Sequence, residues 1–346
     1  MRHFMATVQT SNRQDNIDIM KEIFPVELGL EINKTLKDKS GLTPFFQRSG
    51  RRFFEYLFNY RFHKHFFNMM DPPKATVSLM RELVNTNHYF DNELFHILFK
   101  AFVYAEARFI QNYIPQNSHE ERLTGHLISE YSSALGIVKK TFQQKSLELY
   151  NENLSLDFYY ADLSSNKREK TTGADFGIMF HINLPDYPTE VRTAIFQAKK
   201  FKSNAVIDIA QCNTLKNYGE EGAYYCFYDM TTEGTSSPLV LHANQISLPS
   251  DKTQKTKSYS RDEFFANWDG GIPLSIFLVF NMLSGDNKKY YKTYSNIWQA
   301  KGYFDQKENR ESNPSKLLIV SVGGLTGGGQ DLRELSQLYN FPNFEE

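Results

Sequence analysis

The chain has 346 residues, enough for one large or two medium-sized domains, and its 40% hydrophobic and 23% charged residues are ordinary for a globular protein. The formal net charge of −1 excludes a surface coated in positive charge, although it is compatible with a local basic groove. No run of about 18 apolar residues occurs, so the sequence predicts no membrane contact through a spanning helix. The absence of a signal-peptide pattern, together with two cysteines in apolar surroundings, favours reduced thiols and a cytoplasmic protein.

Residues 1–115 are expected to form a helical N-terminal region. From about residue 26 to residue 112 the aromatic and apolar side chains follow helical spacing, and no strand pattern interrupts them. Arg51 and Arg52 lie among aromatic residues, a mixture that suits phosphate contacts and stacking on bases. An amphipathic helix with solvated cations explains the same pattern, and it is the explanation that we prefer.

Residues 116–300 carry a mixed pattern that predicts an α/β fold, of the α+β type with a mixed sheet. A long helix is expected first, with Ser118 and Glu121 as a capping box at its start. Within residues 116–300 we expect a helix at 119–149, strands at 154–163 and 222–229, a two-stranded hairpin at 171–200, and a helix at 205–217. Residues 301–346 are expected to add a charged linker, a short strand at 317–322 and a final helix.

The hairpin carries a set of side chains that suits phosphodiester hydrolysis. Asp175 lies on its first strand, and Gln197 and Lys199 share a face of its second strand because side chains alternate along a strand. If the strands pair, a carboxylate, an amide oxygen and an ammonium group meet at one edge of a sheet. Asp175, Gln197 and the backbone carbonyl of Ala198 offer the oxygen ligands that a hard divalent cation requires. Lys199 would then stabilise negative charge in the transition state.

Gly173-Ala174-Asp175, followed on the next strand by Gln197-Ala198-Lys199, resembles the PD-(D/E)XK nuclease superfamily. The glutamine in place of the usual acid resembles the Mrr-like branch, which has a QxK motif. The resemblance implies a restriction-endonuclease-like core in which Asp175 and Gln197 bind Mg²⁺ (or Mn²⁺) and Lys199 is catalytic. It covers about residues 118–230.

The resemblance also implies an acidic residue on the preceding helix. Glu121 and Glu130 are the candidates, and a separation of nine residues puts them about 180° apart around a helix, so only one can serve the site. We favour Glu121, as a metal ligand, because the family's acid often lies early in its first helix. Helix capping is the alternative role for Glu121, and pairing with His126 is the alternative for Glu130.

Three further polar residues are expected near this site. Gln211, on the following helix, is expected to orient Lys199 or to contact the nucleic-acid backbone, and a solvated glutamine explains its position equally well. Lys200 and Lys202, at the end of the second hairpin strand, are candidate nucleic-acid contacts, as are Arg51 and Arg52.

Taken with the resemblance, these residues predict a Mg²⁺-dependent DNA endonuclease of a restriction or anti-phage defence system in a bacterial cytoplasm. DNA is the expected partner, and a second copy of the chain or a defence-system protein is a further candidate. The first alternative is a catalytically inactive nuclease-like module that binds nucleic acid or acts as a scaffold, since Gln197 removes one negative charge from the usual set. The second is a helical interaction protein in which the hairpin has no catalytic role.

Overall fold

The computed structural model describes residues 90–162, 173–230, 238–251, 253–260, 272–284, 290–304 and 316–324. The elements expected before residue 90, with Arg51 and Arg52, lie outside these residues, as does the final helix. The described helices and strands are α5 (Glu93–Asn112), η3 (Ile114–Gln116), α6 (Glu120–Tyr150), β1 (Leu156–Asp162), β2 (Phe176–Ile182), β3 (Glu190–Phe201), β4 (Asn204–Asp208), α8 (Ile209–Gly219), η4 (Glu220–Gly222), β5 (Ala223–Asp229), β6 (Leu239–His242), η5 (Ala243–Gln245), β7 (Thr256–Ser260), β8 (Ile272–Pro273), α10 (Leu274–Ile276), η6 (Phe277–Leu283), β9 (Lys292–Tyr294), α11 (Ile297–Phe304) and β10 (Lys316–Val322).

The main sheet is mixed, which confirms the predicted α/β class. Its order is β1-β10-β2-β3-β5-β6-β8, and β9 pairs separately with β3. The expected hairpin is present, since β2 and β3 are antiparallel with Phe176 opposite Phe196. β10 lies between β1 and β2, antiparallel to the first and parallel to the second. The strand that the sequence assigned to a separate C-terminal segment is therefore part of this sheet.

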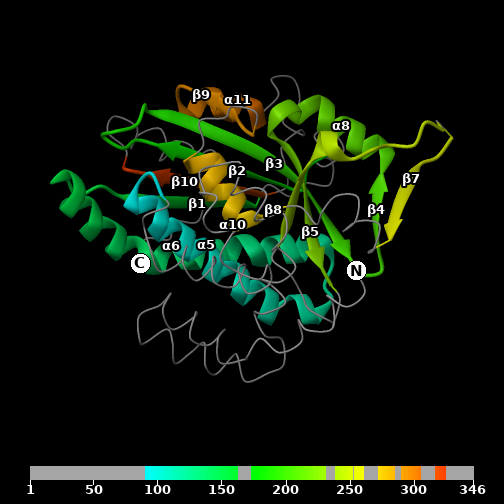
Figure 1. The fold of residues 1–346 in the computed structure, drawn as a ribbon, viewed down its shortest axis with the longest axis horizontal. Helices are drawn as coiled ribbons and strands as arrows, with labels where there is room; N and C mark the ends of the chain where they lie inside the picture. The colour runs from blue at the N-terminus through cyan, green and yellow to red at the C-terminus, as the bar shows by residue number, and fades with distance from the viewer. Residues whose placement is uncertain are drawn as a thin grey trace, which may run out of the picture.

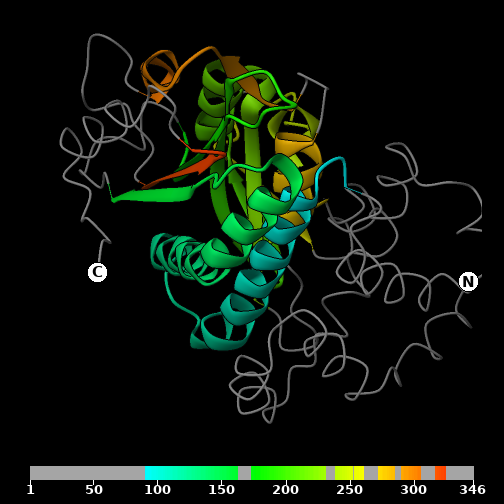
Figure 2. The same ribbon diagram turned by 90° about the vertical axis from the view of Figure 1, so that its left-hand side faces the viewer.

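Helices cover both faces of the sheet (Figures 1 and 2). Alternate side chains of the central strands, such as Phe176 and Phe196, join α5 and α6 in a core rich in aromatic rings. The intervening side chains, such as Met179 and Ile195, pack with α8 and α11 in a second core. Burial of each side chain of this size stabilises the fold by roughly 1.5–3 kcal/mol. Since side chains alternate between the two faces of a strand, the buried apolar residues of β2 and β3 also determine which face each polar residue occupies.

Two local predictions are wrong. The helix expected at 205–217 begins only at Ile209, and the residues before it form β4, which pairs with β7. Ala205 and Ile207 are buried in alternation, and the Asp208 side chain caps α8 by accepting a hydrogen bond from the Gln211 amide at 2.8 Å. The capping box is also absent, because α6 begins after His119 without a side-chain cap.

The helix formed by α10 and η6 is held at both ends by buried charges. At its start the buried Glu106 carboxylate of α5 accepts hydrogen bonds from the Ser275 amide at 2.5 Å and the Ser275 hydroxyl at 3.0 Å, and from Tyr131 at 2.8 Å. At its end the buried Arg192 guanidinium of β3 donates to the last two carbonyl groups of η6, both at 2.9 Å. An anion at the first turn and a cation at the last both complement the helix dipole. This helix therefore links α5 to the sheet.

Replacing Glu106 by alanine is expected to lower the free energy of unfolding by about 3 kcal/mol, because three buried donors lose their acceptor. Urea denaturation measures the change. The matched control is Glu148→Ala, which removes a mostly exposed carboxylate paired with Lys145 and is expected to change stability by less than about 0.5 kcal/mol. Equal urea midpoints for Glu106→Ala and Glu148→Ala would contradict a structural role of the Glu106 carboxylate.

Candidate active site

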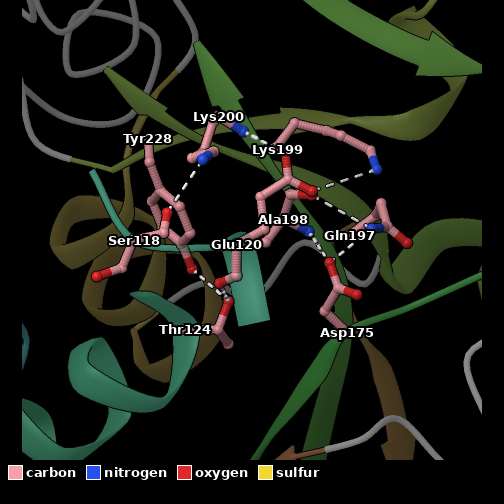
Figure 3. A network of polar contacts seen from close by, with 9 residues as sticks. All are labelled: Ser118, Glu120, Thr124, Asp175, Gln197, Ala198, Lys199, Lys200 and Tyr228. Atoms are coloured by element: carbon pink, nitrogen blue, oxygen red, sulfur yellow. Dashed lines mark hydrogen bonds and ion pairs between the residues drawn. The ribbon is translucent and has the colours of Figure 1, made fainter. Parts of the chain in front are cut away.

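The candidate site lies at one end of the sheet, where β2 begins and β3 ends. Asp175 directly precedes β2, and its amide donates a hydrogen bond to the Phe196 carbonyl at 2.8 Å. Gln197 and Lys199 follow on β3, and their side chains extend to the same side of the strand, away from Lys200 (Figure 3). Asp175 is 9% exposed and Gln197 is 1% exposed. The structure thus brings Asp175 to Gln197, as the alternation of side chains predicts.

The Asp175 carboxylate is bonded directly to β3 (Figure 3). Its Oδ2 accepts hydrogen bonds from the Ala198 backbone amide at 2.7 Å and from Gln197 Nε2 at 2.5 Å. Gln197 Nε2 also donates to the Ala198 carbonyl at 3.2 Å. A buried carboxylate requires such donors, because an unpaired charge in a low-dielectric environment is strongly unfavourable. These contacts fix the position of the carboxylate on the strand that carries Lys199.

Gly173 holds the segment before β2 against α8. It adopts a φ of +67°, and a Cβ atom at this position would lie 2.7 Å from the Gln211 carbonyl oxygen and 3.0 Å from the Leu215 amide nitrogen. Only glycine accepts both the conformation and the close approach. The backbone of Gln211 therefore lies close to the segment that carries Asp175.

The carboxylate that the first turn of α6 brings to β3 belongs to Glu120. Its Oε2 lies 3.7 Å from Lys199 Nζ, and its Oε1 accepts a hydrogen bond from the Lys200 amide at 2.8 Å. Lys200 Nζ donates to the Ser118 carbonyl at 3.0 Å. These contacts attach the start of α6 to the end of β3 (Figure 3). The Lys200 ammonium, expected to contact nucleic acid, is engaged in this attachment, whereas Lys202 is exposed in the turn after β3.

Neither carboxylate named from the sequence makes this contact. Glu121 is exposed, and its Oε1 lies 3.5 Å from Nζ of Lys316 at the start of β10. Glu130 is buried and accepts a hydrogen bond from Arg108 Nε at 2.8 Å. Glu120 was not a candidate from the sequence, since Glu121 was favoured for its place early in the helix, and neighbouring helix positions differ by about 100° in direction.

Comparison of the chain with protein-family models, curated proteins and solved structures finds no match. Any function assigned to it therefore depends on the geometry of its own residues. Among the residues that the structure describes, no helix is long and apolar enough to cross a membrane.

Charges of both signs lie at this end of the sheet. The acids are Asp175, Glu120 and Glu121, and the bases are Lys199, Lys200 and Lys316. Tyr228 adds a neutral polar group, since its hydroxyl lies 2.9 Å from the Thr124 hydroxyl. Burial raises the pKa of Tyr228 well above its usual value, and the Asp175 and Glu120 charges act in the same direction. Tyr228 thus stays protonated and joins β5 to α6 without adding charge.

The oxygen atoms around Asp175 suit a hard divalent cation. The Asp175 carboxylate, the Ala198 carbonyl and Gln197 Oε1 are all oxygen donors of the type that Mg²⁺ prefers. Gln197 Oε1 is buried and has no hydrogen-bond partner within the described ranges, but Nε2 faces the Asp175 carboxylate, so the amide would have to turn before Oε1 could serve as a ligand there. No group of three or more His, Cys, Asp or Glu residues that could hold a metal occurs in the described part of the chain. Metal binding would therefore depend on the neutral oxygens as well as on carboxylates.

Replacing Gly173 by alanine is expected to lower the free energy of unfolding by about 2 kcal/mol, because the new methyl group would strain the backbone and collide with α8. The matched control is Gly136→Ala on α6, where a new Cβ would meet its nearest atom, in Phe158, at an ordinary 3.6 Å. That variant is expected to be unchanged or more stable by about 0.5–1 kcal/mol. Urea denaturation of both variants measures the two changes. Equal stability of Gly173→Ala and Gly136→Ala would contradict the steric constraint at Gly173.

Proposed function

We propose that the chain is a Mg²⁺-dependent nuclease, with Mn²⁺ as a substitute, that hydrolyses DNA phosphodiester bonds as an endonuclease. The supporting observation is the contact of the Asp175 carboxylate with Gln197 and Ala198 on the strand that also carries Lys199. Hydrolysis of a phosphodiester needs a metal-activated water and a cation near the phosphate, and these residue types can provide both.

Each residue has a separate role in this proposal. A bound divalent cation would supply a polarised water and positive charge at the phosphate. Asp175 would hold the cation, oriented by the Ala198 amide, and Gln197 and the Ala198 carbonyl would add neutral oxygens. Lys199 would stabilise the charge that develops on the phosphate oxygens. Glu120, 3.7 Å from the Lys199 ammonium, would position that ammonium group.

The order of elements is compatible with a restriction-endonuclease-like core. Helix α6 is followed by β1, β2 and β3, and α8 then leads to β5 beside β3. β10 lies between β1 and β2 and would be an addition to such a core. DNA as substrate, a defence setting, and a second copy or a defence protein as partner follow from the resemblance of the motifs alone.

One feature favours the inactive, nucleic-acid-binding module as a second candidate. The charged groups of the site have partners within the chain, since Gln197 donates to Asp175 and Glu120 lies beside Lys199. A binding module would retain this network and the exposed Lys202, and it would contact phosphates without cutting them.

Plasmid cleavage with Mg²⁺ is expected for the wild-type chain and is expected to stop when EDTA is added. Asp175→Asn and Lys199→Met should each reduce the rate by about 100-fold or more, because each removes charge that the transition state requires. Lys139→Met is the control, since it removes a partly exposed lysine that pairs with Asp157 away from this site. Cleavage that persists in Asp175→Asn would contradict the proposal. Salt-sensitive DNA binding without cleavage would favour the inactive module.

The two neighbouring glutamates of α6 are expected to differ in their effect. Glu120→Gln should reduce cleavage by about 10-fold, because the Lys199 ammonium loses its charged partner. Glu121→Gln should change the rate by less than about threefold, since Glu121 is exposed and pairs with Lys316. Single-turnover rates of both variants make the comparison. A larger loss of cleavage rate in Glu121→Gln than in Glu120→Gln would instead support Glu121, the carboxylate favoured from the sequence.

A further inference from the structure

Strands β4 and β7 form a separate two-stranded ribbon at the margin of the molecule, beside α8 (Figure 1). They pair antiparallel, from Asn204 opposite Ser260 to Asp208 opposite Thr256. β4 follows β3 after a short turn, since β3 ends at Phe201 and β4 begins at Asn204. Lys199 and Asn204 are separated by at most about 18 Å of extended chain, so the ribbon starts close to the candidate site.

The two faces of this ribbon differ in character. Side chains of the inner face are buried in the second core, and they are Ala205, Ile207 and Tyr259. Side chains of the outer face are exposed and mostly short and polar, and they are Asn204, Val206, Thr256 and Ser258. Val206 is 50% exposed, although a valine in a strand is usually buried on one face. The inner face thus fixes the ribbon to the fold, and the outer face presents hydroxyl, amide and methyl groups to solvent.

Exposed lysines lie at both ends of the outer face. Lys202 precedes β4 and Lys255 precedes β7, and the starts of two antiparallel strands lie at opposite ends of a ribbon. The ribbon and its turns, residues 200–208 and 251–260, contain five lysines and two aspartates, in a chain whose net charge is −1. Both aspartates already accept hydrogen bonds from backbone amides. This part of the surface therefore has the charge that suits a polyanion.

We propose that the β4–β7 ribbon inserts into the major groove of duplex DNA and holds the duplex beside the candidate site. The major groove is about 12 Å wide and admits a two-stranded ribbon. The four intervals from Asn204 to Asp208 span roughly 13 Å, so Lys202 and Lys255 can reach phosphates on both sides of the groove. The short polar side chains of the outer face then contact base edges, and Val206 suits the methyl group of thymine. This inference rests on the proposed action on DNA.

A second copy of the chain matches the same face less well. A symmetric contact between two ribbons would use the same surface of both copies and would bring their lysines close together. Like charges at a contact are unfavourable, whereas the phosphates of DNA are attracted to them. The charge of the ribbon therefore favours DNA over self-association.

Fluorescence anisotropy of a labelled duplex in EDTA measures DNA binding by the full chain without cleavage. The double variant Lys202→Met/Lys255→Met is expected to bind about 10- to 60-fold more weakly at about 0.1 M salt, and the slope of log affinity against log salt should fall by about 2. The matched control is Lys139→Met/Lys145→Met, which removes the same charge from two lysines of α6 that pair with acids. It is expected to change affinity by less than about twofold. Equal losses in the two double variants would overturn the proposal, because net charge alone would then explain binding.

A second duplex separates insertion into the groove from contact with phosphates alone. In this duplex each cytosine carries a glucose unit on C5, which blocks the major groove and leaves the phosphates accessible. The wild-type chain is expected to bind it at least about fivefold more weakly than the plain duplex, because the ribbon can no longer enter. Equal affinity for the two duplexes would overturn the proposal. Self-association that Val206→Asp abolishes in sedimentation, with DNA affinity unchanged, would assign the face to a second copy and would also overturn it.

The outcomes separate this inference from the function on which it rests. If Asp175→Asn still cleaves DNA while Lys202→Met/Lys255→Met loses DNA binding, the proposed active site fails and the role of the ribbon stands. If Asp175→Asn stops cleavage while Lys202→Met/Lys255→Met binds DNA as tightly as the wild type, only the inference is overturned. A wild-type chain that binds no duplex DNA at low salt would overturn both.

Discussion

The contact between the Asp175 carboxylate and the backbone of β3 is the constraint on which the candidate site depends. The regular pairing of β2 and β3 ends at Phe176 and Phe196. Beyond this point the Ala198 amide bonds to the Asp175 side chain. The main-chain groups of Asp175 bond to strands on both sides, its amide to Phe196 on β3 and its carbonyl to the Lys316 amide on β10. The residue that would carry the metal therefore also joins three strands.

The same end of the sheet is closed by α6. Glu120 accepts from the Lys200 amide, and the Ser118 carbonyl accepts from the Lys200 ammonium, so the first turn of the helix is attached to β3 by groups of opposite polarity. Because the helix start is positively polarised, an acid at Glu120 is favourable there as well. Glu120 thus both fixes the position of α6 and places a negative charge beside Lys199. Movement of α6 would displace the partner of Lys199 together with the helix.

Much of this arrangement follows from local patterns in the sequence. Alternation along β2 and β3 was sufficient to predict that Asp175 meets Gln197, and the helix expected at 119–149 matches α6 to within one residue at each end. The partners of β10 could not be predicted, since an apolar run such as Leu317–Val322 is compatible with any buried position in a sheet. β4 was missed because its five residues run directly into α8. Glu120 was missed because the choice of Glu121 depended only on a place early in the helix, and adjacent helix residues point about 100° apart.

The glutamine at position 197 stabilises the buried Asp175 charge, and the same contact would oppose the binding of a cation there. Two carboxylates as close as Asp175 Oδ2 and Gln197 Nε2 would repel one another without a cation, whereas the amide donates a hydrogen bond there. The buried Asp175 charge is therefore compensated by donors of the chain itself. Under the proposed function the same hydrogen bond would compete with the cation, because the amide would have to turn before its oxygen could bind. Under the proposed function, glutamine at position 197 would couple metal binding to a side-chain rotation that a carboxylate, with its two equivalent oxygens, would not require.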